Sequence, residues 1–160
     1  MTMSPPRSGE AGGGTLRTRP LFSMTLAVDG FVTVGSARRI AGITGGSFSG
    51  ERLRGTVLPG GTDWQTLRAD GAVLLDGRIV LRTDDGALVA MTYTGIRHGP
   101  PDVMARLGRG EPVDPASYYF RIVPTFQAAE GRYEWLNRIV AVADGQRLPE
   151  GPVYQVYEIL

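Results

Sequence analysis

The sequence predicts an all-β protein, a single antiparallel β-barrel of eight to ten strands with one short helix. Three observations indicate this fold. Short apolar runs recur along the chain, and turn residues separate them at the spacing typical of sandwiches and barrels. The 23 glycines suit strongly curved strands that bend at barrel corners. The length of 160 residues fits one domain.

The expected strands follow one another from residue 21 to the C-terminus. Asp29-Gly30, Asp76-Gly77 and Asp84-Asp85-Gly86 separate several of them and predict hairpin turns, since Asp-Gly pairs tolerate the backbone angles of tight turns. Only the stretch after Pro100 predicts a helix, over residues 101–107, with proline in its first turn and glycine at its end. The apolar runs span residues 21–28, 31–35, 38–50, 51–58, 72–75, 78–83, 87–99, 118–127, 133–145 and 153–160.

Residues 1–16 differ from the rest of the chain. They are rich in glycine, proline and serine and contain almost nothing that a core could bury. We therefore expect a disordered N-terminal tail over 1–16 and a barrel domain over 17–160.

The composition narrows the chemistry. Cysteine and lysine are both absent, which excludes disulfides, thiolate nucleophiles and Schiff bases. His98 is the only histidine, so a metal site built from histidine and cysteine is excluded, and we expect neither a metal nor a cofactor. A net charge of +1 without a dense basic stretch argues against a nucleic-acid partner. No apolar run is long enough to cross a bilayer, and no secretory signal is visible, so we expect a cytoplasmic protein without a membrane partner. The composition does not exclude assembly into a homo-oligomer.

Several motifs in a fixed order resemble a known family, the domain of unknown function 3237 family, also described as uncharacterised protein family 0311. The likeness covers about residues 21–160, and it implies a compact antiparallel β-barrel but little chemistry. In the family, the strand after Asp76 usually reads Ala-Arg-Tyr, whereas this chain has Gly77-Arg78-Ile79 and so lacks a phenol common in relatives. The motifs are GGSFSGERLRGTVLPGGTDWQ, LRTDDGALV, RHGPPDVMARLGRGEPVDPASYYFR, WLNRIVAVADGQRLPEG and VYEI.

The turn LPGGTDWQ places a carboxylate, Asp63, beside the indole of Trp64. Asp63 could cap the turn by accepting backbone hydrogen bonds. Alternatively, the turn brings both side chains over the mouth of a barrel cavity, where burial would raise the pKa of Asp63 and suit it to acid or base catalysis.

Other polar and aromatic residues lie on expected strands whose alternation could turn them inward. The catalytic candidates are Asp63, Arg121, Glu134 and Tyr119, and the substrate-binding candidates are Trp64, Tyr93, Trp135, Asn137 and Glu51. Each also has a structural interpretation. Glu51 and Arg121 could form ion pairs, the two tryptophans could plug the barrel, and the tyrosines could bond backbone carbonyls.

Two functions from different classes fit these residues. The first is a cofactor-independent cyclase or isomerase that acts on a hydrophobic, polyketide-like small molecule in the barrel cavity, a pericyclic [4+2] ring closure being one form. Arg121 would bind a carbonyl or enolate oxygen, and Asp63 or Glu134 would move a proton. The alternative is a non-catalytic, lipocalin-like binding protein for the same kind of molecule, which needs the cavity but not the acid.

Removal of residues 1–16 should leave the melting temperature within about 2 °C of the full chain, because this segment buries too little apolar surface to offset the entropy of ordering it. Thermal melts of the two proteins, followed by circular dichroism, make the comparison. A clearly lower melting temperature would mean that the segment packs against the barrel or joins an interface.

Overall fold

A computed structural model describes residues 14–160 of the chain. Residues 1–13 lie outside the described part, and with them most of the predicted tail. The backbone enters its first strand at Thr18.

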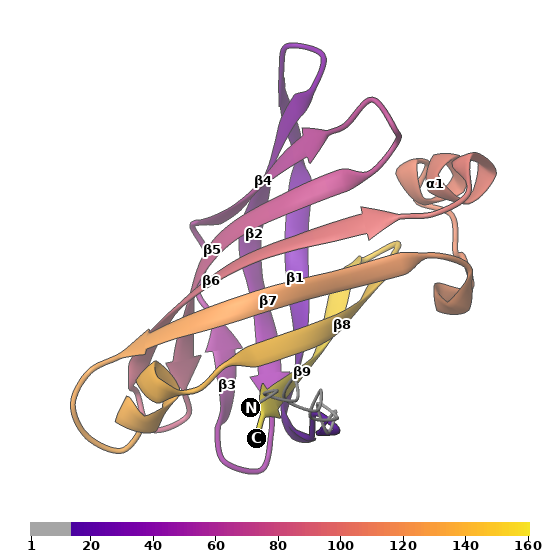
Figure 1. The fold of residues 1–160 in the computed structure, drawn as a ribbon. Coiled ribbons are helices and arrows are strands. Elements are labelled where there is room, and N and C mark those ends of the chain that lie inside the picture. The colour runs from indigo at the N-terminus through magenta and orange to yellow at the C-terminus, as the bar shows by residue number, and fades with distance from the viewer. Residues whose placement is uncertain (1–13) are drawn as a thin grey trace, which may run out of the picture.

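The fold is a closed antiparallel β-barrel with one short α-helix, as predicted (Figure 1). Each strand pairs with its neighbours in a ring, and pairing between β1 and β2 closes it. The short strands β3 and β4 both pair with β2 and β5, so they act as one interrupted strand and the barrel has eight positions. The strands are β1 (Thr18–Val34), β2 (Arg38–Ser49), β3 (Arg54–Val57), β4 (Gly61–Leu67), β5 (Val73–Thr83), β6 (Leu88–His98), β7 (Tyr119–Ala128), β8 (Ala141–Leu148) and β9 (Gly151–Ile159).

The helices lie at the ends of the barrel. Helix α1 (Pro101–Gly108) connects β6 towards β7, where the helix was predicted, and it buries Val103 and Leu107, one turn apart, against the barrel. The 3-10 helix η1 (Pro115–Ser117) precedes β7, and η2 (Glu134–Arg138) lies between β7 and β8 at the opposite end (Figure 1).

Two of the predicted turns are wrong. Asp29-Gly30 forms a bulge inside β1, where the pairing with β2 shifts register and Gly30 has a φ of 47°. The β1–β2 hairpin therefore extends further and projects beyond the barrel (Figure 1). Asp76-Gly77 lies in the middle of β5.

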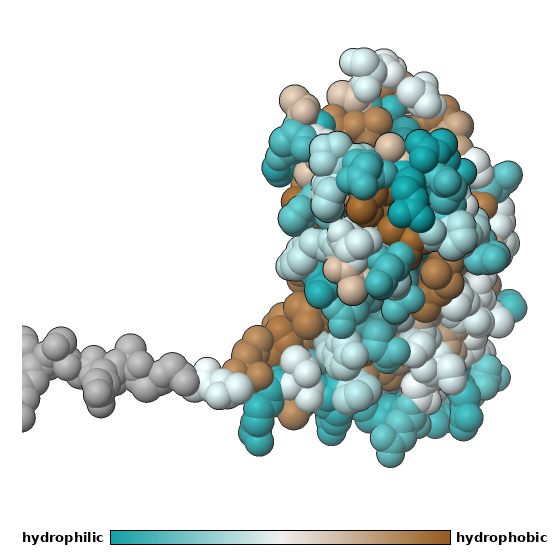
Figure 2. All heavy atoms as spheres, turned by 90° about the vertical axis from the view of Figure 1, so that its right-hand side faces the viewer, coloured by the Kyte–Doolittle hydropathy of each residue, from teal (hydrophilic) through white to brown (hydrophobic). Residues whose placement is uncertain are grey.

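The middle of the barrel is packed with apolar side chains. In strand β5 every second residue is buried and the residues between are exposed or half-buried, as the inward and outward faces of a closed sheet require. Met24, Leu81, Met91 and Ile122 meet in the interior, and each is fully buried. The outward residues leave a surface on which hydrophilic and hydrophobic residues are interspersed on the α1 side (Figure 2).

Gly77 is required by a close contact inside the barrel. A Cβ atom at this position would lie 2.0 Å from Cζ of Tyr93, its partner on β6, because the Tyr93 ring lies on the Gly77 backbone. The glycine that suggested a turn therefore makes room for an interior ring.

Replacement of Gly77 by alanine should lower the free energy of unfolding by about 1–3 kcal/mol, because the Tyr93 ring must leave its packed position. Chemical denaturation measures the change. Gly108→Ala is the matched control: a Cβ there meets no atom within 4 Å. That variant should keep its stability or gain up to about 1 kcal/mol. Equal stability of the two variants would contradict the packing argument.

Candidate functional site

Polar residues gather in the interior at one end of the barrel, beneath the β1–β2 hairpin. Strand β4 alternates so that Asp63 and Gln65 point inward, and Arg97 does so near the end of β6. These three side chains are almost completely buried, with exposed fractions of 5%, 4% and 4%. The remaining buried polar or charged residues among 14–160, Thr83 and Glu158, lie elsewhere in the barrel.

Asp63 accepts two long hydrogen bonds. Its Oδ2 accepts from Nε2 of Gln65 at 3.2 Å, and its Oδ1 accepts from the backbone N–H of Asp76 at 3.3 Å. No ion pair involves Asp63 within residues 14–160. Burial raises the pKa of Asp63, and the hydrogen bonds from Gln65 and Asp76, with the charge of Arg97, offset this only in part. Such a carboxyl keeps its proton to a higher pH than an ordinary aspartate, which suits it to general acid or base catalysis.

Tyr93 and Tyr154 face each other beside Asp63, with ring centroids 5.9 Å apart. Neither hydroxyl has a hydrogen-bond partner in the protein within 3.5 Å, but both lie close enough to Asp63 for this carboxyl to influence their pKa values. Burial raises the pKa of Tyr93 well above its ordinary value, and it also raises the pKa of Tyr154. Both phenols are therefore neutral at pH 7 and can donate hydrogen bonds.

Arg97 is the buried cation of this cluster. Its Nε has no hydrogen-bond partner in the protein, and its guanidinium carbon lies 5.1 Å from the centroid of the Phe120 ring. Burial lowers the pKa of Arg97 to about 10, so the side chain stays charged at neutral pH. Three buried donors, on Tyr93, Tyr154 and Arg97, thus lie around one carboxyl without partners of their own, and such orphaned groups call for an explanation.

A depression lies over this cluster. Only about 10 Å³ of it can be occupied by the centres of water molecules, room for roughly one water. Its rim is apolar where the hairpin and the start of β9 contribute Val28, Phe31 and Pro152. The other lining residues are Ala41, Ile43, Asp63, Gln65, Leu75, Tyr93, Arg97, Arg147 and Tyr154.

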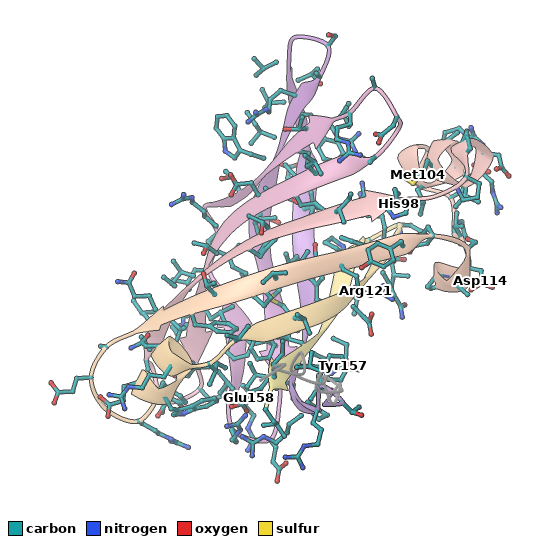
Figure 3. The ribbon with its side chains drawn as sticks, in the orientation of Figure 1. His98, Met104, Asp114, Arg121, Tyr157 and Glu158 are labelled. Carbon is teal, nitrogen blue, oxygen red and sulfur yellow. The ribbon has the colours of Figure 1, made fainter. Side chains whose placement is uncertain are left out.

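The structure places Trp64, Tyr119 and Arg121 on the outer face, away from Asp63 and Tyr93. Trp64 is 44% exposed because neighbours on a strand point to opposite faces. Arg121 binds Asp144 through an ion pair of 2.8 Å and lies over the Tyr119 ring on the outer side of β7 (Figure 3). These three line a shallow outer groove of about 570 Å³. The expectation of one interior cavity is therefore wrong for them.

Four further candidates lie at the opposite end of the barrel, three of them on η2 where a strand was expected. Asn137 accepts from the backbone N–H of Ala128 at 2.7 Å and donates to its carbonyl at 2.8 Å, which ties η2 to the end of β7. Trp135 is covered by the guanidinium of Arg52, at 4.1 Å, and Arg52 binds Glu158. These contacts give Trp135 and Asn137 structural roles.

The two acidic candidates at this end, Glu51 and Glu134, also lie far from Asp63. Glu134 is part of η2, and Glu51 follows β2 and lines a pocket of about 260 Å³ together with Tyr133. Neither shares the cavity expected for it with Asp63.

Arg97, Gln65 and Tyr154 were not among the residues predicted for the site. The alternation Met91, Tyr93, Gly95, Arg97 places Arg97 on the face of Tyr93, so this residue could have been found. Gln65 follows Asp63 by two residues and could have been found in the same way.

Two observations concern metals and membranes. Within residues 14–160, no group of three or more histidine, aspartate or glutamate side chains is arranged to hold a metal ion. None of the helices described in that range has the length and apolar character needed to cross a bilayer.

Comparison with known proteins identifies the family. Residues 16–159 match the family described as "Protein of unknown function (DUF3237)". A UPF0311 protein of Rhodopseudomonas palustris is 37% identical over 150 residues, which cover 91% of this chain and 98% of that protein. The chain belongs to this family. The resemblance seen in the sequence motifs is therefore confirmed.

Solved structures agree with the fold. The crystal structure of the R. palustris relative has a TM-score of 0.89 and covers 92% of this chain and 99% of its own. A more distant relative, the "Hydroalkoxylation enzyme phnH" of Penicillium herquei, is 26% identical over 117 residues, 73% of this chain and 63% of that protein. The structure of an enzyme from P. herquei has a TM-score of 0.69 at 22% identity over the whole of both chains, which shows a shared fold.

The raised pKa of Asp63 predicts a specific pH dependence of stability. The folded protein holds this proton more tightly than the unfolded chain, where the aspartate pKa is about 3.9. Ionisation of Asp63 therefore lowers the free energy of unfolding as the pH rises from the ordinary pKa through the raised one. We expect Asp63→Asn to lose this decrease, so that its stability gains on the native protein as the pH rises above the ordinary aspartate pKa of about 3.9.

Urea unfolding at a series of pH values measures the difference. Asp76→Asn is the control, since Asp76 is exposed on the outer face of the same sheet. Its pH dependence should follow that of the native protein. Parallel curves for the native protein and Asp63→Asn would contradict a raised pKa of Asp63.

Proposed function

We propose that this protein is a cofactor-independent cyclase or isomerase that closes a ring in a hydrophobic, polyketide-like small molecule by moving a proton. The observation that carries the proposal is Asp63, a buried carboxyl with a raised pKa, surrounded by buried donors that have no partner in the protein. Perturbed pKa values and unpaired polar groups in a concave site are typical of catalytic centres. The distant relative named as a hydroalkoxylation enzyme supports ring closure through oxygen.

Hydroalkoxylation adds an O–H group across a carbon–carbon double bond. In the proposed reaction, the protonated carboxyl of Asp63 gives its proton to one alkene carbon, and the hydroxyl oxygen of the same substrate bonds to the other carbon. The hydroxyl proton then returns to the Asp63 carboxylate. Atoms and electrons balance within one substrate molecule, so the step is an isomerisation that needs no oxidant, reductant or cofactor.

The buried donors act on an oxygen atom of the substrate, where they stabilise negative charge. Tyr93 and Tyr154 stay neutral at pH 7 and donate hydrogen bonds to a carbonyl or enol oxygen, and Arg97 adds a positive charge. Donors that are fixed in a site shielded from water stabilise developing charge more strongly than water does. The tilted rings of Tyr93 and Tyr154 also form a wall that restricts the shape of the substrate.

The substrate lies across the mouth of the depression with its reacting end at the base. The apolar rim of Val28, Phe31 and Pro152 accepts the hydrophobic part. The volume at the base is too small for a ring system, so binding displaces side chains at the mouth. Phe31 is 41% exposed, so its movement would give up little buried surface, although it would lose the contact of 4.3 Å with the guanidinium of Arg39.

Asp63→Asn should abolish ring closure, with a loss of at least about 10²-fold in kcat/KM. Chromatography of reactions with a panel of phenols that carry an ortho-allyl or ortho-prenyl group measures the cyclic ether formed. Tyr93→Phe, which removes only the orphan hydroxyl, should lower the rate about tenfold.

Asp76→Asn and Arg121→Gln serve as controls, because both residues point outward. They should retain the native rate. A folded Asp63→Asn variant with full turnover would overturn the proposal. Tight binding without any turnover would instead indicate a lipocalin-like carrier.

A further inference from the structure

Three arginines converge on the end of the barrel that contains Asp63. Arg97 and Arg147 line the depression, and Arg39 reaches its edge, where it donates to Gln65 at 2.8 Å. Their charges act on one another: after burial itself, repulsion from Arg147 and Arg39 is among the causes that lower the pKa of Arg97. One carboxyl, that of Asp63, opposes three cations at this end. The cluster therefore carries an excess of positive charge.

None of the three guanidinium groups is neutralised by an ion pair. The seven ion pairs within residues 14–160 all involve other arginines. Arg147 donates to the backbone carbonyl of Leu148 at 2.8 Å, Arg39 covers the Phe31 ring, and Arg97 covers the Phe120 ring. Contacts with carbonyls and rings satisfy part of their donor capacity and leave the charge uncompensated.

Arg97 is buried without an acid partner, whereas Arg39 and Arg147 are partly buried. Burial of an unpaired cation costs folding free energy. This uncompensated charge lies at the same end of the barrel as the hydroxyls of Tyr93 and Tyr154, which have no hydrogen-bond partner in the protein. A negatively charged hydrogen-bond acceptor would satisfy the unpaired hydroxyls and also compensate the excess of positive charge. A single anionic oxygen in the depression would accept from the hydroxyls and offset the excess charge.

We propose that the ligand of this site carries an anionic oxygen, a carboxylate or an ionised enol or phenol, on an apolar body, and that Arg97 binds this oxygen with Arg39 and Arg147 around it. This assignment rests on the proposed function, since it names the class of substrate for the same site. The anion anchors the molecule, and the apolar body lies along Val28, Phe31 and Pro152. The anchor holds the reacting carbon beside the Asp63 carboxyl.

Binding of small aromatic probes tests the assignment. Isothermal titration calorimetry at pH 7 compares 2-naphthoate with its neutral isostere 2-naphthamide. We expect 2-naphthoate to bind at least about tenfold more tightly, because hydrogen bonds to charged groups are the strong ones. 4-Nitrophenol represents the ionised phenol, and its absorbance should show that the bound form is the phenolate. A preference for one probe over the other identifies which anion the site takes.

Arg97→Met should weaken 2-naphthoate binding at least about tenfold and leave 2-naphthamide unchanged within about twofold. Arg121→Met is the matched control, an arginine on the outer face, and it should change neither affinity. Arg147→Met provides a second variant should Arg97→Met fail to fold, and it should weaken 2-naphthoate selectively. Equal binding of the acid and the amide by the native protein, or undiminished 2-naphthoate binding by both lumen variants, overturns the assignment.

Asp63→Asn separates this inference from the proposed function. The substitution removes the proton donor and a negative charge, so ring closure should stop while 2-naphthoate binds as tightly as before or more tightly. Full turnover by Asp63→Asn would overturn the proton-transfer mechanism without contradicting the proposal of an anionic ligand. If the native protein binds the acid and the amide equally well but its turnover still depends on Asp63, only the proposal of an anionic ligand is overturned.

Discussion

The contact between the Tyr93 ring and the Gly77 backbone fixes the candidate site. The ring lies where a side chain of residue 77 would otherwise begin, and Phe120 lies against Gly145 in a similar way. Tyr154 packs against both rings, with centroid distances of 5.9 Å to Tyr93 and 5.4 Å to Phe120. The three rings form a floor that separates the apolar middle of the barrel from the polar end. Without room for flat rings over glycine backbone, the donors around Asp63 would have no fixed support.

Buried charged side chains have ion-pair partners at one end of the barrel and lack them at the other. At one end, the buried carboxylate of Glu158 accepts from Arg19 at 2.7 Å and also binds Arg52, so its charge is matched. At the other end, Asp63 has only neutral donors in contact and Arg97 has no acid in contact. Matched charge is what a structural closure requires, and unmatched charge lowers stability unless a function maintains it. This contrast within one barrel favours the end that contains Asp63 as the location of the functional site.

The sequence predicted those features correctly that depend on a single local pattern. Turn spacing predicted the barrel, Pro101 and the glycine at 108 predicted the helix, and the turn before Asp63 drew attention to a carboxyl that burial does perturb. Trp64 was grouped with Asp63 although period-two alternation sends strand neighbours to opposite faces. Trp135 and its neighbours follow an apolar pattern that a short 3-10 helix can also bury. Barrel closure brings inward side chains of β8 and β9 together with Arg97 of β6 across the interior. No local pattern could therefore place Arg147 or Tyr154 near Arg97.

The positions of the two tryptophans determine what intrinsic fluorescence can report. Trp64 looks outward from β4, and Trp135 stacks beneath Arg52 at the far end of the barrel. The aromatic residues around Asp63 are tyrosines and phenylalanines, whose emission is weak beside that of an indole. Tryptophan emission will therefore follow unfolding or events on the outer groove and stay nearly silent when a molecule enters the lumen. An indole introduced at Phe31 would give the mouth of the barrel an optical signal of its own.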